Sequence, residues 1–244
     1  IKWVFAITRG GFTSASLFPI FALASMLAAF GDNLFNPLSL IFCLAGVVFL
    51  HLSSNLFNDY FDVKHGTDGI NYEYFNAGLN STMLEGAQLS GGSRAIELGL
   101  ITLNGTKRLA NIMLLLTVFC TLMLLINSYI VTQSFNNLIM ALLIGFIGWF
   151  LGYFYTAKPI RLSARRGLGE LAIFLTFGPL LTLGAYYAIS SSTIELFSQG
   201  FYNAIYIGIP FGFLTTNILF INQFPDTNSA VSYTHLTLPT IAIV

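Results

Sequence analysis

Charged residues are scarce in this sequence: aspartate, glutamate, lysine and arginine together make up 8% of its 244 residues. Soluble domains carry about 25% charged residues, so this chain has too few to cover a water-facing surface. Its positive and negative charges cancel to a net charge of zero, which gives no general attraction to nucleic acid. We therefore expect neither a soluble domain nor a nucleic-acid partner.

Cysteine is equally rare. The two cysteines, Cys43 and Cys120, each lie alone within an apolar run. They form no CxxC pair and no disulfide framework. Each is therefore interpreted as a buried, chemically inert thiol.

What the sequence has in abundance is apolar runs, and 55% of its residues are hydrophobic. A hydrocarbon core of about 30 Å takes roughly 20 helical residues to cross. Each crossing segment must be helical, because unpaired backbone groups in lipid cost several kcal/mol. The sequence therefore predicts an all-α fold, a polytopic transmembrane helix bundle. The six predicted spans are 12–30, 37–56, 109–131, 138–157, 171–190 and 201–224.

Two sets of small or rigid residues lie inside these spans. A proline predicts a kink, and glycines repeated along one span predict close approach of a neighbouring helix. The prolines are Pro19, Pro179 and Pro210, and the glycines are Gly145, Gly148 and Gly152 of the fourth span.

Basic residues are confined to one side of the predicted membrane. With six spans, both chain ends share a side with the loops after spans two and four, and all ten basic residues fall there. The positive-inside rule places that side in the cytoplasm. We therefore predict a multi-pass protein of the cell (inner) membrane, with its N-terminus and active site cytoplasmic. The basic residues are Lys2, Arg9, Lys64, Arg94, Lys107, Arg108, Lys158, Arg161, Arg165 and Arg166.

Acidic residues follow the same partition, with only Asp32 and Glu195 on the other side. The positive-inside rule does not require this, because acids contribute little to topology. Charges of both signs gathered at one membrane face indicate a site for a charged, membrane-soluble molecule.

The most informative stretch ends the second span and runs from Asn55 to Asp62. At 100° per residue, Asn55, Asp59 and Asp62 lie within an arc of about 60° on one helix face. Neighbouring carboxylates repel one another, so such a cluster needs a cation or a raised pKa. Mg²⁺ fits, because it prefers oxygen ligands and is usually held by one or two carboxylates plus substrate phosphates. The alternative is that the two acids merely solvate the membrane interface.

A second pair repeats this spacing: Asn222 and Asp226 end the sixth span on the same side. The stretch from Asn55 through Gly66 to Asp68 resembles the first aspartate-rich motif of the UbiA-type prenyltransferases, and Asn222–Asp226 resembles the opening of their second. The segments 155–161 and 166–170 resemble the family's connection between spans four and five. Ser90–Arg94 resembles the loop of its 1,4-dihydroxy-2-naphthoate branch.

This resemblance implies an enzyme: Mg²⁺-dependent transfer of a polyprenyl group from an isoprenyl diphosphate to an aromatic acid, within the lipid bilayer. The acceptor it favours is 1,4-dihydroxy-2-naphthoate, in menaquinone biosynthesis. The implied metal ligands are Asp59, Asp62 and Asp226. The implied catalytic residues are Asn55, Lys158, Arg161, Arg166 and Asn222. The implied substrate contacts are Arg94, Tyr60, Tyr155 and Asp68, with Tyr153 a further candidate for the cation pocket.

Each of these roles has a plainer alternative. The basic residues satisfy the positive-inside rule by themselves, and the tyrosines suit an interfacial aromatic belt. His51, one turn before Asn55, is interpreted as a packed polar residue rather than a base.

The sequence departs from the family pattern near its end. The family usually has nine spans, and its second motif continues to a further aspartate, where this chain has Ala230. We therefore expect residues 1–229 to be a partial prenyltransferase domain with six of nine spans. Residues 230–244 are expected to be a non-native tail, and the chain to be inactive as it stands.

Three other functions compete with this interpretation. A related enzyme could use 4-hydroxybenzoate or another quinone or porphyrin acceptor. A transporter is disfavoured, because transporter sites lie near the bilayer midplane and no charged residue lies inside any predicted span. A membrane scaffold without chemistry leaves the repeated Asn-xxx-Asp pair unexplained.

Overall fold

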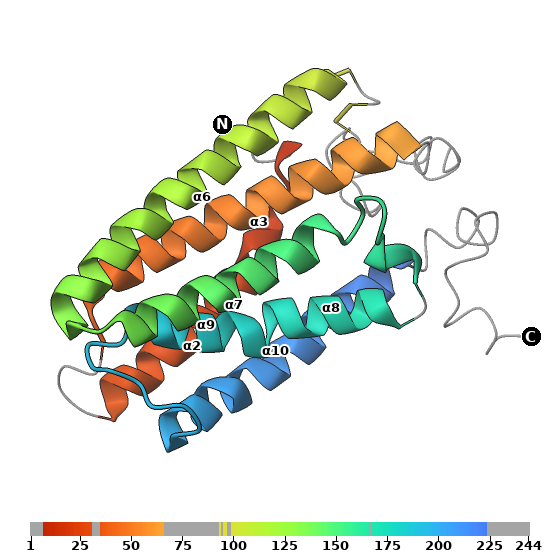
Figure 1. Cartoon of the computed structure of the whole chain (residues 1–244). Coiled ribbons are helices and arrows are strands. Elements are labelled where there is room, and N and C mark those ends of the chain that lie inside the picture. The colour runs from red at the N-terminus through yellow and green to blue at the C-terminus, as the bar shows by residue number, and fades with distance from the viewer. Residues whose placement is uncertain are drawn as a thin grey trace, which may run out of the picture.

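The computed structural model describes residues 7–30, 35–65, 93, 95–96, 99–165 and 167–223. Six helical segments in this part of the chain are long and apolar enough to cross a membrane, and they match the six predicted spans. The predicted all-α bundle is confirmed (Figure 1). The elements are η1 (Gly10–Thr13), α2 (Ser14–Ala29), α3 (Pro37–His65), α6 (Leu103–Thr132), α7 (Phe135–Tyr153), η3 (Leu162–Ala164), α8 (Leu168–Phe177), α9 (Pro179–Ile189) and α10 (Gln199–Gln223).

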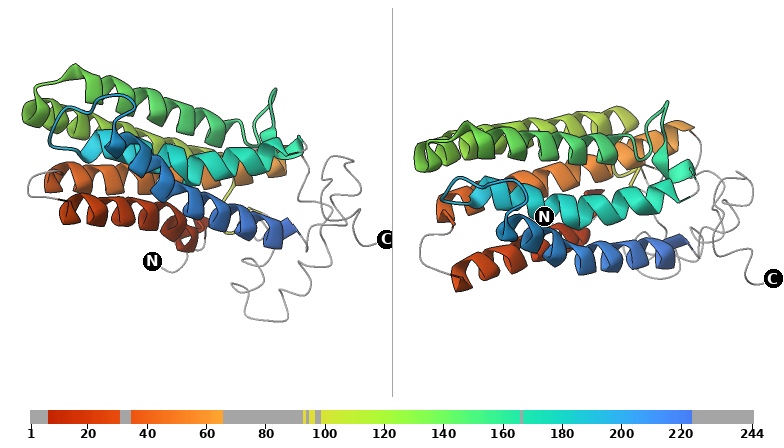
Figure 2. Two further views of the ribbon diagram at one scale, coloured as in Figure 1. Left: turned by 90° about the horizontal axis from the view of Figure 1, so that it is seen from below. Right: turned by 60° about the horizontal axis from the view of Figure 1, so that its bottom comes forward.

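The helices pack side by side around a small apolar core. The long pair α3 and α6 makes the most extensive contact, while α9 packs against both α7 and α10 (Figures 1 and 2). The core includes Ile20, Leu23 and Tyr187, all fully buried. Large apolar side chains such as Phe18 and Leu115 are exposed on the outside of the bundle. In water such a surface would be unfavourable; in a bilayer it is the expected lipid-facing layer.

The two ends of the bundle differ sharply in charge. Helices α3, α7 and α10 end, and helices α6 and α8 begin, at the same end of the bundle, on the right in Figure 1. We call this the charged end. Every lysine and arginine among the described residues lies there. Among the described residues of the opposite end, the exposed Glu195 alone is charged. There buried Asn137 donates to the carbonyl of Ser192 at 2.9 Å and accepts from the amide of Ile194 at 2.9 Å.

The fifth span is not one helix. α8 ends at Phe177 and α9 begins at Pro179, with Gly178 outside the helical region at φ −117° and ψ −110°. Proline has no N–H to continue the ladder, so the predicted disruption occurs at Pro179. Pro19 and Pro210, by contrast, lie within helices that continue past them.

Helix α10 packs directly on this break. A Cβ at Gly178 would lie 2.7 Å from the carbonyl oxygen of Gly208 and 2.9 Å from the Cα of Gly212. A Cβ at Gly212 would meet the Phe174 carbonyl oxygen at 2.6 Å. Only glycine permits so close a backbone approach, so these glycines seat α10 against the fifth span.

The glycines predicted to allow close packing are different ones, and that prediction is wrong for two of the three. A Cβ at Gly145 or Gly148 would have no neighbour within 4 Å. Only Gly152 approaches another helix, at 3.1 Å from the Ser54 hydroxyl. The physical reason is that Gly145 and Gly148 face a cavity, so their small size widens it instead of joining two helices.

Replacing Gly212 by alanine tests the packing of α10. We expect Gly212→Ala to lower the free energy of unfolding by about 1–3 kcal/mol, because its Cβ would force the helices apart. The matched control is Gly148→Ala, where the added methyl group meets nothing and the better helix propensity stabilises by up to about 1 kcal/mol. Stepwise SDS unfolding followed by circular dichroism measures both. Equal stability of the two variants would contradict the close packing.

Candidate active site

The acidic motif lies on α3, as predicted, because that helix runs unbroken to His65. Asp59 is only 5% exposed. One of its carboxylate oxygens lies 3.9 Å from the Arg9 guanidinium and accepts a 3.4 Å hydrogen bond from the backbone amide of Ser93. Asn55, one turn earlier, donates to the carbonyl of Thr8 at 3.3 Å. Asn55 and Asp59 are therefore packed against residues Thr8 and Arg9 before the first span, and these two are not simply solvated side chains.

Arg9 is a site residue that sequence analysis counted only as a topological charge. It adopts a left-handed backbone conformation with φ 54° at the start of η1, which is uncommon for a residue with a side chain. Its guanidinium lies over the Phe12 ring at 5.2 Å, as well as beside Asp59. No sequence spacing links residues so far apart, so only the fold could reveal this pair.

An apolar cavity of about 590 Å³ begins beside this motif. Asn55, Asn58 and Tyr155 line it near the charged end, whereas Leu124 and Ala188 line its deep part. The walls come from α3, α6, α7, α8 and α9. Such a cavity suits a long apolar ligand with a polar end at the carboxylates.

The cavity also opens sideways. Three residues, Val118 of α6 with Leu142 and Phe146 of α7, both line the cavity and are exposed on the outside of the bundle. In a bilayer this opening faces lipid, so an apolar ligand can enter without crossing water.

Tyr155 and Asn58 join the motif to the loop after α7. The Asn58 amide oxygen accepts a 2.9 Å hydrogen bond from the Thr156 hydroxyl. Burial raises the pKa of the Tyr155 phenol, and the nearby carboxylates of Glu170 and Asp62 raise it further, against a smaller opposing effect of Arg9. Tyr155 is therefore a neutral hydroxyl at the cavity mouth, where it can donate a hydrogen bond.

Residues 154–165 fold back as a tight loop in which two candidate basic residues lie. The amides of Leu162 and Ser163 donate to the carbonyls of Phe154 and Tyr155. Lys158 is exposed. Arg161 adopts a left-handed conformation with φ 45°, and its buried Nε finds no hydrogen-bond acceptor in the part of the chain that the structure describes. Backbone strain of this kind clusters at functional sites, and a buried donor without a partner calls for an explanation.

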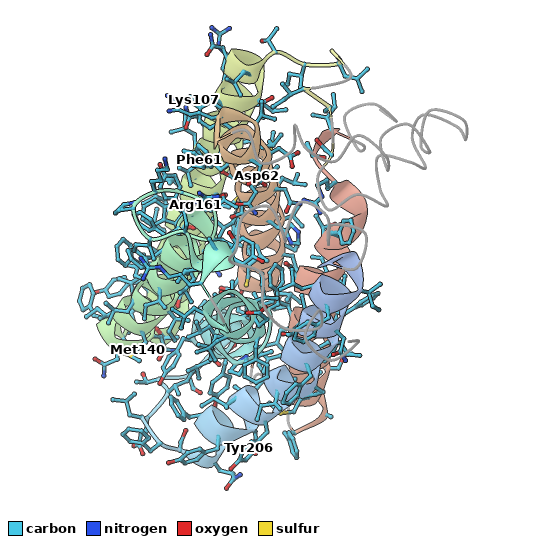
Figure 3. The ribbon with its side chains drawn as sticks, turned by 90° about the vertical axis from the view of Figure 1, so that its right-hand side faces the viewer. Phe61, Asp62, Lys107, Met140, Arg161 and Tyr206 are labelled. Carbon is cyan, nitrogen blue, oxygen red and sulfur yellow. The ribbon has the colours of Figure 1, made fainter. Side chains whose placement is uncertain are left out.

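The view onto the charged end in Figure 3 labels Asp62 and Arg161, the acidic and basic candidates there. Two predicted aromatic contacts are placed away from the cavity. Tyr60 is not among the cavity residues: it is buried against Phe61, and the ammonium groups of Lys64 and Lys107 lie 5.6 and 5.8 Å from its ring centroid. Tyr153 packs on neighbouring aromatic rings and is not among the cavity residues.

Five other candidates are not placed. Asp68, Arg94, Arg166 and Asp226 lie outside the described residues, as do the segment 230–244 and its expected boundary. Asn222 lies in the last turn of α10, with its side chain outside the described part.

The fold, and an apolar cavity whose polar mouth adjoins Asp59, define a class of protein, a helical membrane protein with an internal cavity. Comparison with known protein families gives a more specific class: residues 16–242 match the UbiA prenyltransferase family. The chain belongs to that family.

Two curated proteins are similar to this chain in sequence. One is the 2-carboxy-1,4-naphthoquinone phytyltransferase of Synechocystis, which is 43% identical over 75 residues, 31% of this chain and 22% of the relative. The other is the UbiA prenyltransferase domain-containing protein 1 of Dictyostelium discoideum, 26% identical over 207 residues, 84% of this chain and 53% of the relative. The alignments thus span about half or less of the relatives' lengths. No solved structure matches the chain.

The donor atoms at the charged end fit part of a magnesium site. Asp59 and Asp62 offer carboxylate oxygens and Asn55 an amide oxygen, the hard donors that Mg²⁺ prefers. Within the described ranges no group of three or more histidine, cysteine or acidic side chains comes together. The remaining predicted ligand, Asp226, lies outside those ranges.

A double-mutant cycle tests the buried contact between Arg9 and Asp59. Arg9→Met leaves the Asp59 carboxylate buried without that cation, and we expect it to cost about 1–3 kcal/mol of stability. Adding Asp59→Asn should recover part of this loss, giving a coupling energy of about 0.5–3 kcal/mol. SDS unfolding measures all three variants. Arg165→Met, which removes an exposed arginine at the same end, is the control; purely additive effects would show that the pair is not coupled.

Proposed function

We propose that this protein transfers a polyprenyl group from an isoprenyl diphosphate to an aromatic acceptor, 1,4-dihydroxy-2-naphthoate, in menaquinone biosynthesis. The observation that carries the proposal is the juxtaposition of carboxylates and an apolar cavity. Asp59 follows Asn58 and lies one turn beyond Asn55, and both asparagines line the cavity mouth. A diphosphate with a long prenyl tail is a molecule with this division of polarity. Family membership supports the same chemistry.

In this proposal the charged end holds the diphosphate. Asp59 and Asp62, with Asp226, would hold Mg²⁺, which would neutralise the charge of the diphosphate and so make it a better leaving group. Arg161, whose buried Nε has no acceptor among the described residues, is proposed to contact a phosphate oxygen through its guanidinium, and Lys158 adds charge in the same loop. Arg94 and Arg166 are proposed to contact the diphosphate too, with Asn55 and Asn222 orienting the carboxylates.

The cavity walls serve the next stage. Loss of diphosphate leaves an allylic cation, which water would capture, so the reaction needs a dry pocket. The lining is dominated by aliphatic and aromatic side chains. Tyr155 places its hydroxyl group at the mouth of this pocket. The electron-rich ring of the acceptor then forms a carbon–carbon bond with the cation and gives up a proton.

Less evidence supports the choice of acceptor than supports the reaction class. One relative is named for a 2-carboxy-1,4-naphthoquinone substrate, which is the oxidised form of 1,4-dihydroxy-2-naphthoate. The alignment covers less than a third of this chain, so this support concerns one segment only. 4-Hydroxybenzoate stays the alternative within the same reaction class.

The broken fifth span is a feature that transporters also use, at the bilayer midplane. Here the break at Gly178 is filled by the backbone of α10 at Gly208 and Gly212. None of the described residues at this break is charged, so the break offers no charged ligand for a coupling ion. The enzyme is therefore the function that we favour.

Removing one carboxylate tests the enzyme directly. In the protein at the full length that its gene encodes, we expect Asp59→Asn to lower the rate of prenyl transfer by at least ~100-fold, because a metal ligand is lost. The assay follows transfer from a radiolabelled isoprenyl diphosphate to 1,4-dihydroxy-2-naphthoate in nanodiscs, with Mg²⁺ or EDTA. The control, Glu195→Gln, removes an exposed carboxylate at the opposite end and should be fully active. Wild-type activity of Asp59→Asn, or in EDTA, would eliminate the metal role.

We further propose that the charged end faces the cytoplasm. The distribution of basic residues supports this orientation by the positive-inside rule. Alkaline phosphatase, which is active only outside the cytoplasm, is fused in two places: the turn between α6 and α7, at the opposite end, and the loop 154–165. We expect activity from the first fusion and none from the second. The reverse pattern would invert the topology and place the active site outside.

A further inference from the structure

His51 is a polar side chain that the diphosphate chemistry does not use. It lies on α3 one turn deeper than Asn55, and it lines the cavity with only 8% of its surface exposed. Most cavity residues around it are aliphatic or aromatic. A histidine in such a setting requires polar partners, because an unsatisfied polar atom in an apolar environment costs about 1–3 kcal/mol.

The imidazole ring is held firmly from two other helices. Its Nδ1 lies 2.6 Å from the Ser16 hydroxyl of α2. The imidazole and the Phe177 ring of α8 make a T-shaped contact, with ring centroids 5.3 Å apart and ring planes at 70°. Because α2, α3 and α8 all contribute, the ring orientation is fixed before any ligand binds.

This arrangement leaves the second ring nitrogen for a ligand. In the described part of the chain the only hydrogen-bond partner of His51 is Ser16, at Nδ1. Nε2 is then the nitrogen that a molecule in the cavity can reach. A hydroxyl group suits it in either tautomer, because a hydroxyl both donates and accepts. A prenyl tail has no polar atom and gains nothing there.

We propose that His51, oriented by Ser16, forms a hydrogen bond through Nε2 with a ring hydroxyl of the aromatic acceptor. This proposal rests on the proposed function, and it assigns the acceptor to a definite level of the cavity. Four residues of helix separate His51 from Asn55, a rise of about 6 Å. The acceptor ring therefore lies between the buried histidine and the cavity mouth, with one hydroxyl pointing inward and the opposite edge toward the departing diphosphate.

The test separates the two substrates by steady-state kinetics. In the full-length protein, we expect His51→Leu to raise the KM for 1,4-dihydroxy-2-naphthoate by about 10-fold, the value of one neutral hydrogen bond. The KM for the isoprenyl diphosphate should change less than about twofold on the same reasoning. His51→Gln, which keeps a hydrogen-bonding group, should recover part of the acceptor affinity. Ser16→Ala, which only loosens the ring, should give a smaller rise than His51→Leu.

A binding titration makes the test independent of turnover. Binding of 1,4-dihydroxy-2-naphthoate and of 2-naphthoate, which lacks the hydroxyls, is followed by intrinsic fluorescence in wild type, His51→Gln and Ser16→Ala. The substitutions should weaken binding of the dihydroxy compound and leave 2-naphthoate unchanged. Transfer without this difference would overturn the His51 assignment alone, whereas the difference without any transfer would overturn the proposed reaction alone. Equal weakening of both compounds would mean that His51 is only structural.

Discussion

The unbroken helix α3 is the constraint on which the rest of the structure depends. It crosses the bundle and continues to His65, so one rigid element carries His51 and Asn55 along the cavity and Asp59 and Asp62 beyond its mouth. Because polar atoms are costly inside an apolar bundle, the charged members of this face lie only at the helix end. The fixed rise of a helix then sets the spacing between the deep polar group and the carboxylates. In our proposals this spacing sets how far the acceptor at His51 lies from the diphosphate at the carboxylates.

Residues from other elements fix the positions of the α3 side chains. Arg9 and Ser93 hold the Asp59 carboxylate from the side, and the loop after α7 brings Thr156 to Asn58. The fifth span breaks at Gly178, and α10 fits into the break through Gly208 and Gly212. The break places Phe177 against His51, so an irregularity in the backbone also orients a side chain in the cavity.

Much of this arrangement could be predicted from the sequence. Six apolar runs predicted the six spans, because a hydrocarbon layer leaves the backbone no other choice. Helical periodicity placed Asn55, Asp59 and Asp62 on one face, because these residues lie within eight positions of one another. The pairs that sequence analysis missed, Arg9 with Asp59 and Ser16 with His51, join residues 50 and 35 positions apart. Such pairs depend on how helices pack, which spacing within one helix does not reveal. The glycines of the fourth span show the same limit: a small residue fits a close contact or a cavity wall equally well, and only the neighbouring helices decide which.

The central claim is that the carboxylates of α3 and the apolar cavity bind one molecule. An experimental structure of the full-length protein in a nanodisc, with Mg²⁺ and a non-reactive isoprenyl thiodiphosphate, tests it most directly. We expect phosphate density among Asp59, Asp62 and Arg161, with the prenyl tail running into the cavity past Asn55. Phosphate density away from Asp59 and Asp62, or a tail lying on the outer surface of the bundle, would contradict it.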